Sequence, residues 1–227
     1  MREASFAKSP LKQLHTTKPM IRRHNREGPV WEDAEIDESD MINGIPHLTA
    51  VEYEREQEFK QHIISLLEAY DWNVDTEVLD DERRGRVDIV AEHPAVGCVA
   101  IEVKRTRNYT TRHIAEGFAQ ILNYRSYTYS DHDIDYWALA PGFDGEIRPY
   151  RNRKKRHMQV RNMFRRTLAE LKLGMLSRRR EAIAFGKQLD WCIPLRDPET
   201  MTEDDLDTIN KKIASREWDA SGYDPRQ

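Results

Sequence analysis

Three charged side chains on two consecutive apolar segments have the types and spacing needed to hydrolyse a phosphodiester bond. Asp88 lies on the first segment, and Glu102 and Lys104 lie on the second. Carboxylate oxygens bind hard divalent cations such as Mg²⁺, and a lysine ammonium can stabilise the negative charge that develops when water attacks a phosphate. Charges on an otherwise apolar strand cost stability unless they are paired or bind a ligand, which makes these residues candidates for chemistry.

Strand context separates this Glu-x-Lys from two others. Tripeptides of the same type start at Glu58 and Glu170, but both lie in helical patterns, where residues two apart diverge. Side chains on a strand alternate between faces, so Glu102 and Lys104 point the same way while Val103 points into a core. The strand tripeptide is therefore the one predicted to present its acid and its base together.

Hydrophobic periodicity predicts the elements that must position these residues. The expected order is a helix from Thr49 to Tyr70, strands at 72–79, 86–91 and 98–104, a helix at 112–127, a strand at 136–140, a basic helix within 148–180 that ends at Gly174, edge strands at 175–177 and 182–185, and an acidic helix from Thr202. This order predicts an α/β (α+β) fold, with a small mixed sheet of about four core strands flanked by helices. The first three strands are expected to form a meander.

Composition limits the organisation and the class of protein. The chain has 227 residues, of which 38% are hydrophobic and 33% are charged, which predicts tails around one core. We expect a disordered tail at 1–47, a catalytic domain at 48–195, and an acidic extension with one helix at 196–227. Two cysteines exclude a four-cysteine metal site built from this chain alone. The sequence has no long apolar run and no secretory signal, so we expect a cytoplasmic protein without a membrane partner.

The order of Asp88, Glu102 and Lys104, with thirteen residues between the first two, resembles the signature of the PD-(D/E)xK nuclease superfamily. The resemblance covers roughly residues 50–190 and implies a restriction-endonuclease-like fold. It further implies that Asp88, Glu102 and the carbonyl of Val103 bind Mg²⁺ or Mn²⁺. Lys104 would then position the attacking water or stabilise charge on the phosphate.

Many members of this superfamily add a glutamate from the first helix. Four candidates lie close together there: Glu52, Glu54, Glu56 and Glu58. Glu56 precedes Phe59 by three residues and Ile63 by seven, so helical spacing places it on the core-facing stripe. We therefore predict that Glu56 is the catalytic glutamate, with Glu52 as the alternative, and that Glu54 and Glu58 are solvated.

Gln120 and Tyr124 resemble the Gln-x-x-x-Tyr motif of the RecB-like exonuclease branch. Residues four apart share one face of a helix, so both side chains could reach the metal site or a phosphate. That branch often carries an iron–sulfur cluster on four cysteines, and this chain departs from it in having two.

Positive charge is concentrated in one segment. Residues 148–180 contain thirteen Lys or Arg and a single acid, Glu170. Such a segment can follow a phosphate backbone and release counterions. Three further arginines flank the candidate site. The predicted DNA-binding residues are Arg84, Arg86, Arg105, Arg153, Lys154, Lys155, Arg156, Arg161 and Arg165.

Together these patterns predict a metal-dependent DNA nuclease of the exonuclease or repair and recombination type. A Holliday-junction resolvase or a restriction-type endonuclease would use the same three residues, and a resolvase would be a homodimer. A non-catalytic DNA-binding module on a nuclease scaffold is the alternative of another class. The intact Asp88, Glu102 and Lys104 favour catalysis.

Overall fold

The computed structural model describes residues 31–32, 35–105, 111–141, 163, 166–186 and 191–215. Three α-helices have defined bounds in this part of the chain, and residues 166–171 form a further helical segment. The elements are the 3₁₀ turn η1 (Glu38–Asp40), β1 (Met41–Ile42), β2 (Ile45–Pro46), α1 (Glu56–Glu68), β3 (Asn73–Leu79), β4 (Arg86–His93), β5 (Gly97–Val103), α2 (Thr111–Tyr124), β6 (Ile134–Ala140), β7 (Gly174–Ser177), β8 (Ala182–Phe185), β9 (Trp191–Pro194), η2 (Pro198–Thr200) and α4 (Glu203–Ser215).

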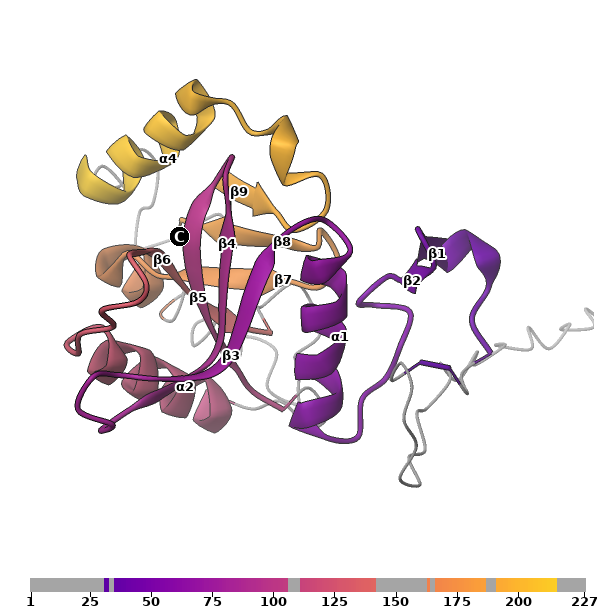
Figure 1. The fold of residues 1–227 in the computed structure, drawn as a ribbon, viewed down its shortest axis with the longest axis horizontal. Coiled ribbons are helices and arrows are strands. Elements are labelled where there is room, and N and C mark those ends of the chain that lie inside the picture. Colours follow the sequence, from indigo (N-terminus) through magenta and orange to yellow (C-terminus); the bar gives the residue numbers. More distant parts are fainter. Residues whose placement is uncertain are drawn as a thin grey trace, which may run out of the picture.

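A mixed sheet of seven strands forms the centre of the fold (Figure 1), in the order β3-β4-β5-β6-β7-β8-β9. Strands β3, β4 and β5 are antiparallel neighbours, which confirms the predicted meander. Strand β6 runs parallel to both β5 and β7, and β8 and β9 complete an antiparallel edge. The mixed α/β class is confirmed, but the expectation of about four core strands is too low, because the short strands β7, β8 and β9 continue the same sheet.

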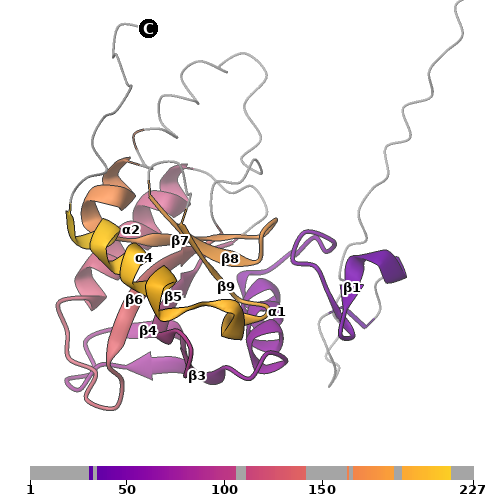
Figure 2. The same cartoon turned by 90° about the horizontal axis from the view of Figure 1, so that it is seen from above.

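Two hydrophobic clusters lie on opposite faces of the sheet. Phe59 and Ile63 of α1 pack in one cluster with Ile101 of β5, and Phe118 of α2 packs in the other with Ala100. Adjacent residues of β5 therefore serve different cores, as the period of two in a strand requires. Each fully buried apolar side chain contributes about 1.5–3 kcal/mol. Figures 1 and 2 show α1 and α2 at different sides of the sheet.

The segment before α1 is ordered over part of the predicted tail. Residues 35–47 include η1 and the β1–β2 hairpin, and Ile45 and Pro46 are buried. Arg196 donates hydrogen bonds of 3.3 Å to the carbonyls of both residues. The expected disordered tail at 1–47 is therefore wrong for residues 35–47, because the buried guanidinium of Arg196, which follows β9, binds this hairpin.

Helix α1 begins at Glu56, seven residues after the predicted N-cap Thr49. The backbone before it is bonded elsewhere: Leu48 N–H donates to Glu181 at 2.6 Å, and the carbonyl of Val51 accepts from Arg178 at 2.9 Å. Glu58 is only 2% exposed, and its Oε2 accepts from the N–H groups of Glu54 and Arg55. The prediction that Glu58 is solvated is wrong, because it satisfies donors at the helix start that have no partner within the helix.

Gly174 also has a different role from the predicted one. The described helical residues end at 171, and Gly174 opens β7 rather than capping the helix. A Cβ at Gly174 would lie 2.5 Å from Ile183 Cγ2 of the neighbouring strand β8, so close strand packing explains the glycine. The predicted acidic C-terminal helix is confirmed as α4. None of the helices in the described ranges is long and apolar enough to span a membrane.

Candidate active site

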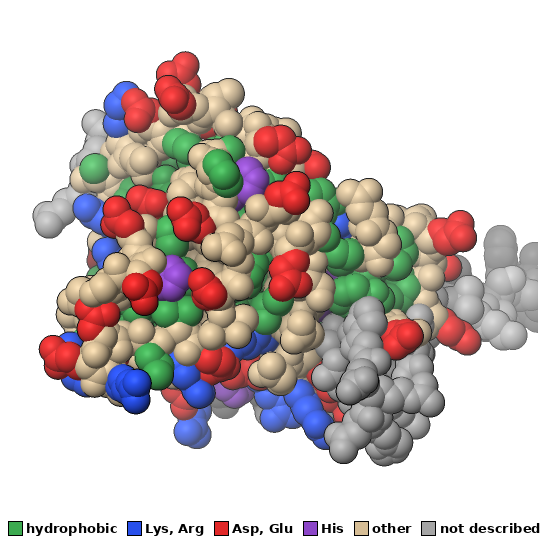
Figure 3. Space-filling model, viewed as in Figure 1, with side chains coloured by type: hydrophobic (Ala, Val, Ile, Leu, Met, Phe, Trp, Pro, Cys, Tyr) green, Lys and Arg blue, Asp and Glu red, His purple; other side chains and the backbone are tan. Residues whose placement is uncertain are grey.

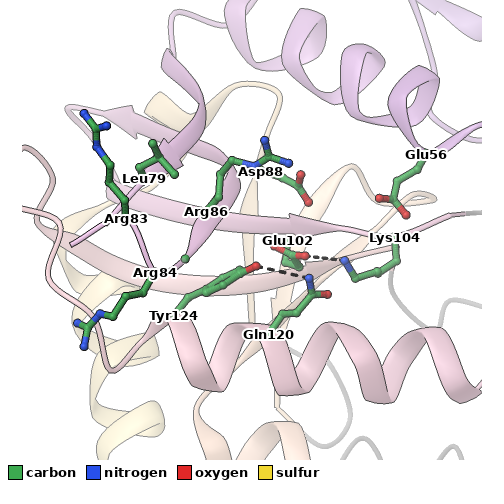
Figure 4. Close-up of a pocket in the computed structure, with 11 residues that line it drawn as sticks. Glu56, Leu79, Arg83, Arg84, Arg86, Asp88, Glu102, Lys104, Gln120 and Tyr124 are labelled. Atoms are coloured by element: carbon green, nitrogen blue, oxygen red, sulfur yellow. Dashed lines mark hydrogen bonds and ion pairs between the residues drawn. The ribbon is translucent and has the colours of Figure 1, made fainter. Parts of the chain in front are cut away.

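A cleft of about 470 Å³ contains all six predicted catalytic side chains. They come from α1, β4, the end of β5 and α2, and Figure 4 shows α1 and α2 on opposite sides of the strands. The catalytic candidates in the lining are Glu56, Asp88, Glu102, Lys104, Gln120 and Tyr124. Four segments that are separate in the sequence therefore meet at one place, and each brings a polar group to it.

Strand β5 presents Glu102 and Lys104 on one face, as the alternation predicts. Lys104 Nζ lies 2.5 Å from Glu102 Oε1, while Val103 is fully buried in the core on the other face. Glu102 is 3% exposed, and its Oε2 is a buried oxygen with no hydrogen-bond partner in the part of the chain that the structure describes. Burial, followed by the nearby charge of Asp88, raises the pKa of Glu102 to about 7.

Asp88 lies on β4 beside Glu102. The register between β4 and β5 pairs Ile89 with Ile101, and continuing it by one residue places Asp88 opposite Glu102. Asp88 Oδ2 accepts a hydrogen bond of 2.9 Å from the N–H of Val103, and Oδ1 lies 3.3 Å from Lys60 Nζ. Directly opposite residues share a face with their Cβ atoms about 5 Å apart, so the thirteen-residue spacing corresponds to one hairpin.

Glu56 is the one of the four candidate glutamates that lines the cleft. It lies in the first turn of α1 and points toward Lys104 in Figure 4. Glu52 is exposed and is absent from the lining. The predicted glutamate thus lines the cleft, but the helix-face argument behind it was wrong, because Glu56 is exposed and Glu58 is buried.

Gln120 and Tyr124 line the α2 side of the cleft. Gln120 Nε2 lies 3.4 Å from Tyr124 Oη, as expected for residues four apart on a helix. Burial, with a smaller contribution from the charge of Glu102, raises the pKa of the Tyr124 phenol. A Cβ at Gly85 would lie 2.8 Å from Tyr124 Cδ1 and 2.7 Å from Tyr127 Cε2, so the glycine allows the β3–β4 turn to pack against these rings.

Three arginines form the basic side of the cleft: Arg83, Arg84 and Arg86. The guanidinium of Arg84 lies 4.4 Å from the centre of the Tyr127 ring and also pairs with Glu82 at 3.2 Å. On the face seen in Figure 3, acidic side chains are spread widely, whereas Lys and Arg gather along the lower edge. In Figure 1 the β3–β4 turn and the start of α1 lie at that edge.

The other predicted DNA-binding residues are not placed in the cleft. Arg105 is exposed and is absent from the lining. The remaining six lie outside the described residues: Arg153, Lys154, Lys155, Arg156, Arg161 and Arg165.

Sequence reasoning missed Arg83, which lines the cleft, and two residues that contact lining residues, Lys60 and Glu77. Lys60 is 3% exposed and contacts both Asp88 and Glu77. Helical spacing could have found Lys60, because it follows Glu56 by four residues on the same helix. No sequence pattern identifies Glu77, whose φ of 58° is unusual for a residue in a strand.

The donor set fits a magnesium or manganese ion held by few protein ligands. Within the described ranges no three His, Cys, Asp or Glu side chains are grouped closely enough to hold a metal. Mg²⁺ is commonly bound through one or two carboxylates, with water and substrate phosphate as the other ligands. Asp88 and Glu102 supply such a pair, and the unpartnered Oε2 of Glu102 is an oxygen that a cation would satisfy. The N–H of Val103 holds Asp88, while the predicted role of the Val103 carbonyl stays a prediction.

The arrangement combines an acidic centre with cationic groups at its margin. Lys104 lies at the centre beside Glu102, and the arginines line one side. These groups suit a reaction in which a phosphate approaches a cation held by carboxylates and gains negative charge during attack by water. No family model, no curated protein and no solved structure matches this chain.

Proposed function

We propose that this chain is a divalent-metal-dependent nuclease that hydrolyses phosphodiester bonds in DNA, related to the PD-(D/E)xK nucleases. The observation that carries the proposal is the convergence of Asp88, Glu102, Lys104 and Glu56 in one cleft, with Glu102 Oε2 buried and unpartnered within the described structure. Buried acidic groups without partners are costly, and a cation would remove that cost.

Each residue has a role that follows from its position. Asp88 and Glu102 hold Mg²⁺ or Mn²⁺, which when bound polarises the phosphate and lowers the pKa of the attacking water. Lys104 stabilises the charge that develops on the phosphate oxygens. Glu56 reaches the cleft from α1 and orients the water, and the Gln120–Tyr124 pair contacts the phosphate from α2.

The basic side of the cleft supports a nucleic acid as the substrate. Arg83, Arg84 and Arg86 line it, and a polyanion would approach the acidic centre along this side. The Lys/Arg-rich segment that begins at Arg148 would add phosphate contacts, which is a prediction from sequence alone. The three guanidinium groups favour DNA or another phosphodiester over an uncharged substrate.

A cleavage assay tests the proposal. The full chain is incubated with Mg²⁺ or Mn²⁺ and with linear, circular and four-way-junction DNA, with EDTA as the control. Loss of linear DNA alone indicates an exonuclease, cutting of the circle indicates an endonuclease, and cutting of the junction alone indicates a resolvase. DNA binding without cleavage of any substrate would contradict the proposed nuclease activity and would favour a non-catalytic DNA-binding module.

A further inference from the structure

Lys60 is a buried helical cation that does not itself line the cleft but contacts Asp88, one of the carboxylates that does. It lies on α1, one helical turn after Glu56, and is 3% exposed. Its Nζ forms ion pairs with Glu77 Oε1 and, at 3.3 Å, with Asp88 Oδ1. Burying a charged ammonium group costs free energy unless the group is paired. The two carboxylates that contact Lys60 offset this cost.

The strand register shows why two carboxylates meet there. Thr76 pairs with Ile89 and Val78 pairs with Val87, so Glu77 lies opposite Asp88. Asp88 in turn lies opposite Glu102 when the β4–β5 register is continued by one residue. Three acidic residues therefore form one cross-strand row over β3, β4 and β5. Like charges directly opposite one another destabilise a sheet unless cations lie between them.

Glu77 is held in its place at a conformational cost. Its φ of 58° lies in the left-handed region, which is unfavourable for a residue with a side chain. Its second carboxylate oxygen, Oε2, lies 2.6 Å from Arg86 Nε, an ion pair that lacks hydrogen-bond geometry, so this oxygen makes no hydrogen bond within the described structure. Glu77 thus has a cationic partner for each oxygen, one from α1 and one from β4.

The row contains two pairs of neighbouring carboxylates, Glu77 with Asp88 and Asp88 with Glu102, and the cationic contacts of the two pairs differ. Lys60 bridges the gap between Glu77 and Asp88. In the gap between Asp88 and Glu102 the cationic contact is Lys104, and it reaches only Oε1 of Glu102, leaving Oε2 without a partner within the described structure. Two-metal nuclease sites place two divalent ions about 3.5–4 Å apart around shared carboxylates.

We propose that the Lys60 ammonium occupies the place of a second cation, so that the cleft binds one divalent ion, between Asp88 and Glu102. This inference rests on the proposed metal-dependent function and specifies its stoichiometry. Lys60 is a positioning residue in this arrangement: it fixes Asp88 and keeps Glu77 out of the ligand set. Removing its charge while keeping its length should open a second site between Glu77 and Asp88.

Titration of Mn²⁺ into the full chain, without DNA, measures this directly. Calorimetry and the electron paramagnetic resonance signal of free Mn²⁺ both report the number of ions bound. We expect one ion per wild-type chain, two per Lys60→Met chain, and one again in Lys60→Met/Glu77→Gln, because the second site needs Glu77. Lys211→Met is the matched control, since Lys211 is exposed on α4 and its partner among the described residues is Asp207, one helical turn away.

The possible failures separate the two proposals. A wild-type chain that binds no Mn²⁺ contradicts the proposed metal-dependent function itself. A wild-type chain that binds two ions, or a folded Lys60→Met chain that still binds one, overturns the role of Lys60 alone. If Lys60→Met does not fold, Glu77→Gln decides: it should still bind one ion, and loss of that ion would make Glu77 a ligand and overturn the inference.

Discussion

The N–H of Val103 donates a hydrogen bond of 2.9 Å to Oδ2 of Asp88, which joins β5 to β4 between Glu102 and Lys104. This bond fixes the carboxylate of Asp88 relative to the strand that carries the other two candidates. The backbone of the Glu-x-Lys tripeptide therefore has a role beside that of its side chains. It orients Asp88, one of the two proposed metal ligands, on the neighbouring strand.

The first prediction concerns pH and Glu102. Its folded-state pKa of about 7 lies above the ordinary value of 4.5, so the folded protein holds the proton more tightly than the unfolded chain. The resulting stability is fully present below pH 4.5 and is lost as pH rises to about 7. Without divalent ions, the wild type should lose roughly 3 kcal/mol relative to Glu102→Gln between pH 4.5 and pH 8.

Urea unfolding of both proteins at several pH values, in EDTA, gives this difference. Comparison with Glu102→Gln removes the titration of the groups that do not interact with Glu102. Addition of Mg²⁺ should restore the stability of the wild type at pH 8 and have little effect on the variant. A wild type that becomes more stable than the variant as pH rises would contradict the burial argument.

The second prediction concerns Lys104. Replacement by Met keeps most of the side-chain length and removes the charge that lies 2.5 Å from Glu102. Cleavage at saturating DNA and metal should fall by about 10²–10³-fold, as for loss of a group that stabilises transition-state charge. Metal affinity, measured by calorimetry, should be retained. A variant that fails to bind metal would show that Lys104 organises the ligands rather than the reaction.

The third prediction is a matched pair on α1. Glu56→Gln should lower activity by about 10–100-fold, the usual effect of a group that orients a metal site or its water. Glu68→Gln is the control, because Glu68 is exposed at the other end of the same helix. Glu58 is unsuitable as a control, since it binds the N–H groups of Glu54 and Arg55. Equal activity of the two variants would show that Glu56 has no role in cleavage.

Sequence patterns found the six catalytic candidates that line the cleft, but not Arg83. The period of two put Glu102 and Lys104 on one face, and the helical period paired Gln120 with Tyr124. These inferences succeed because local side-chain direction follows from the element alone. The start of α1 could not be predicted in the same way, because Glu181 and Arg178 bond the preceding backbone from more than 120 residues away.

The remaining misses have a similar origin in long-range contacts. Strand β9 has four residues and no alternation to identify it, and it exists because β8 pairs with it. The left-handed backbone of Glu77 gives no sequence signal, so its contact with Lys60 could not be foreseen. Hydrophobic patterning thus predicts which face a residue takes, whereas the number of strands and the ion pairs between elements depend on tertiary structure.

The fourth prediction concerns DNA binding by the basic segment. Changing Lys154, Lys155 and Arg156 together to Glu should weaken binding of any DNA sequence about equally. The slope of log affinity against log salt should fall by up to about three, roughly one for each lost phosphate contact. Binding measured at several salt concentrations gives the slope. An unchanged slope would show that these three residues do not contact DNA phosphates. The candidates for those contacts would then be Arg83, Arg84 and Arg86 at the cleft.

The most direct test of the metal-dependent nuclease compares two isosteric changes on neighbouring strands. Asp88→Asn removes a carboxylate charge inside the cleft, and Asp75→Asn does so on β3 outside the lining, where Asp75 pairs weakly with His132 at 3.8 Å. Cleavage of linear, circular and junction DNA is measured with Mg²⁺, with circular dichroism to verify folding. We expect the wild type and Asp75→Asn to cleave at least one substrate at similar rates, and Asp88→Asn to remain folded and cleave at least about 10³-fold more slowly. Cleavage by Asp88→Asn at the wild-type rate would contradict the assignment of Asp88 as a metal ligand. Absence of cleavage by the wild type would contradict the proposal that the protein is a nuclease.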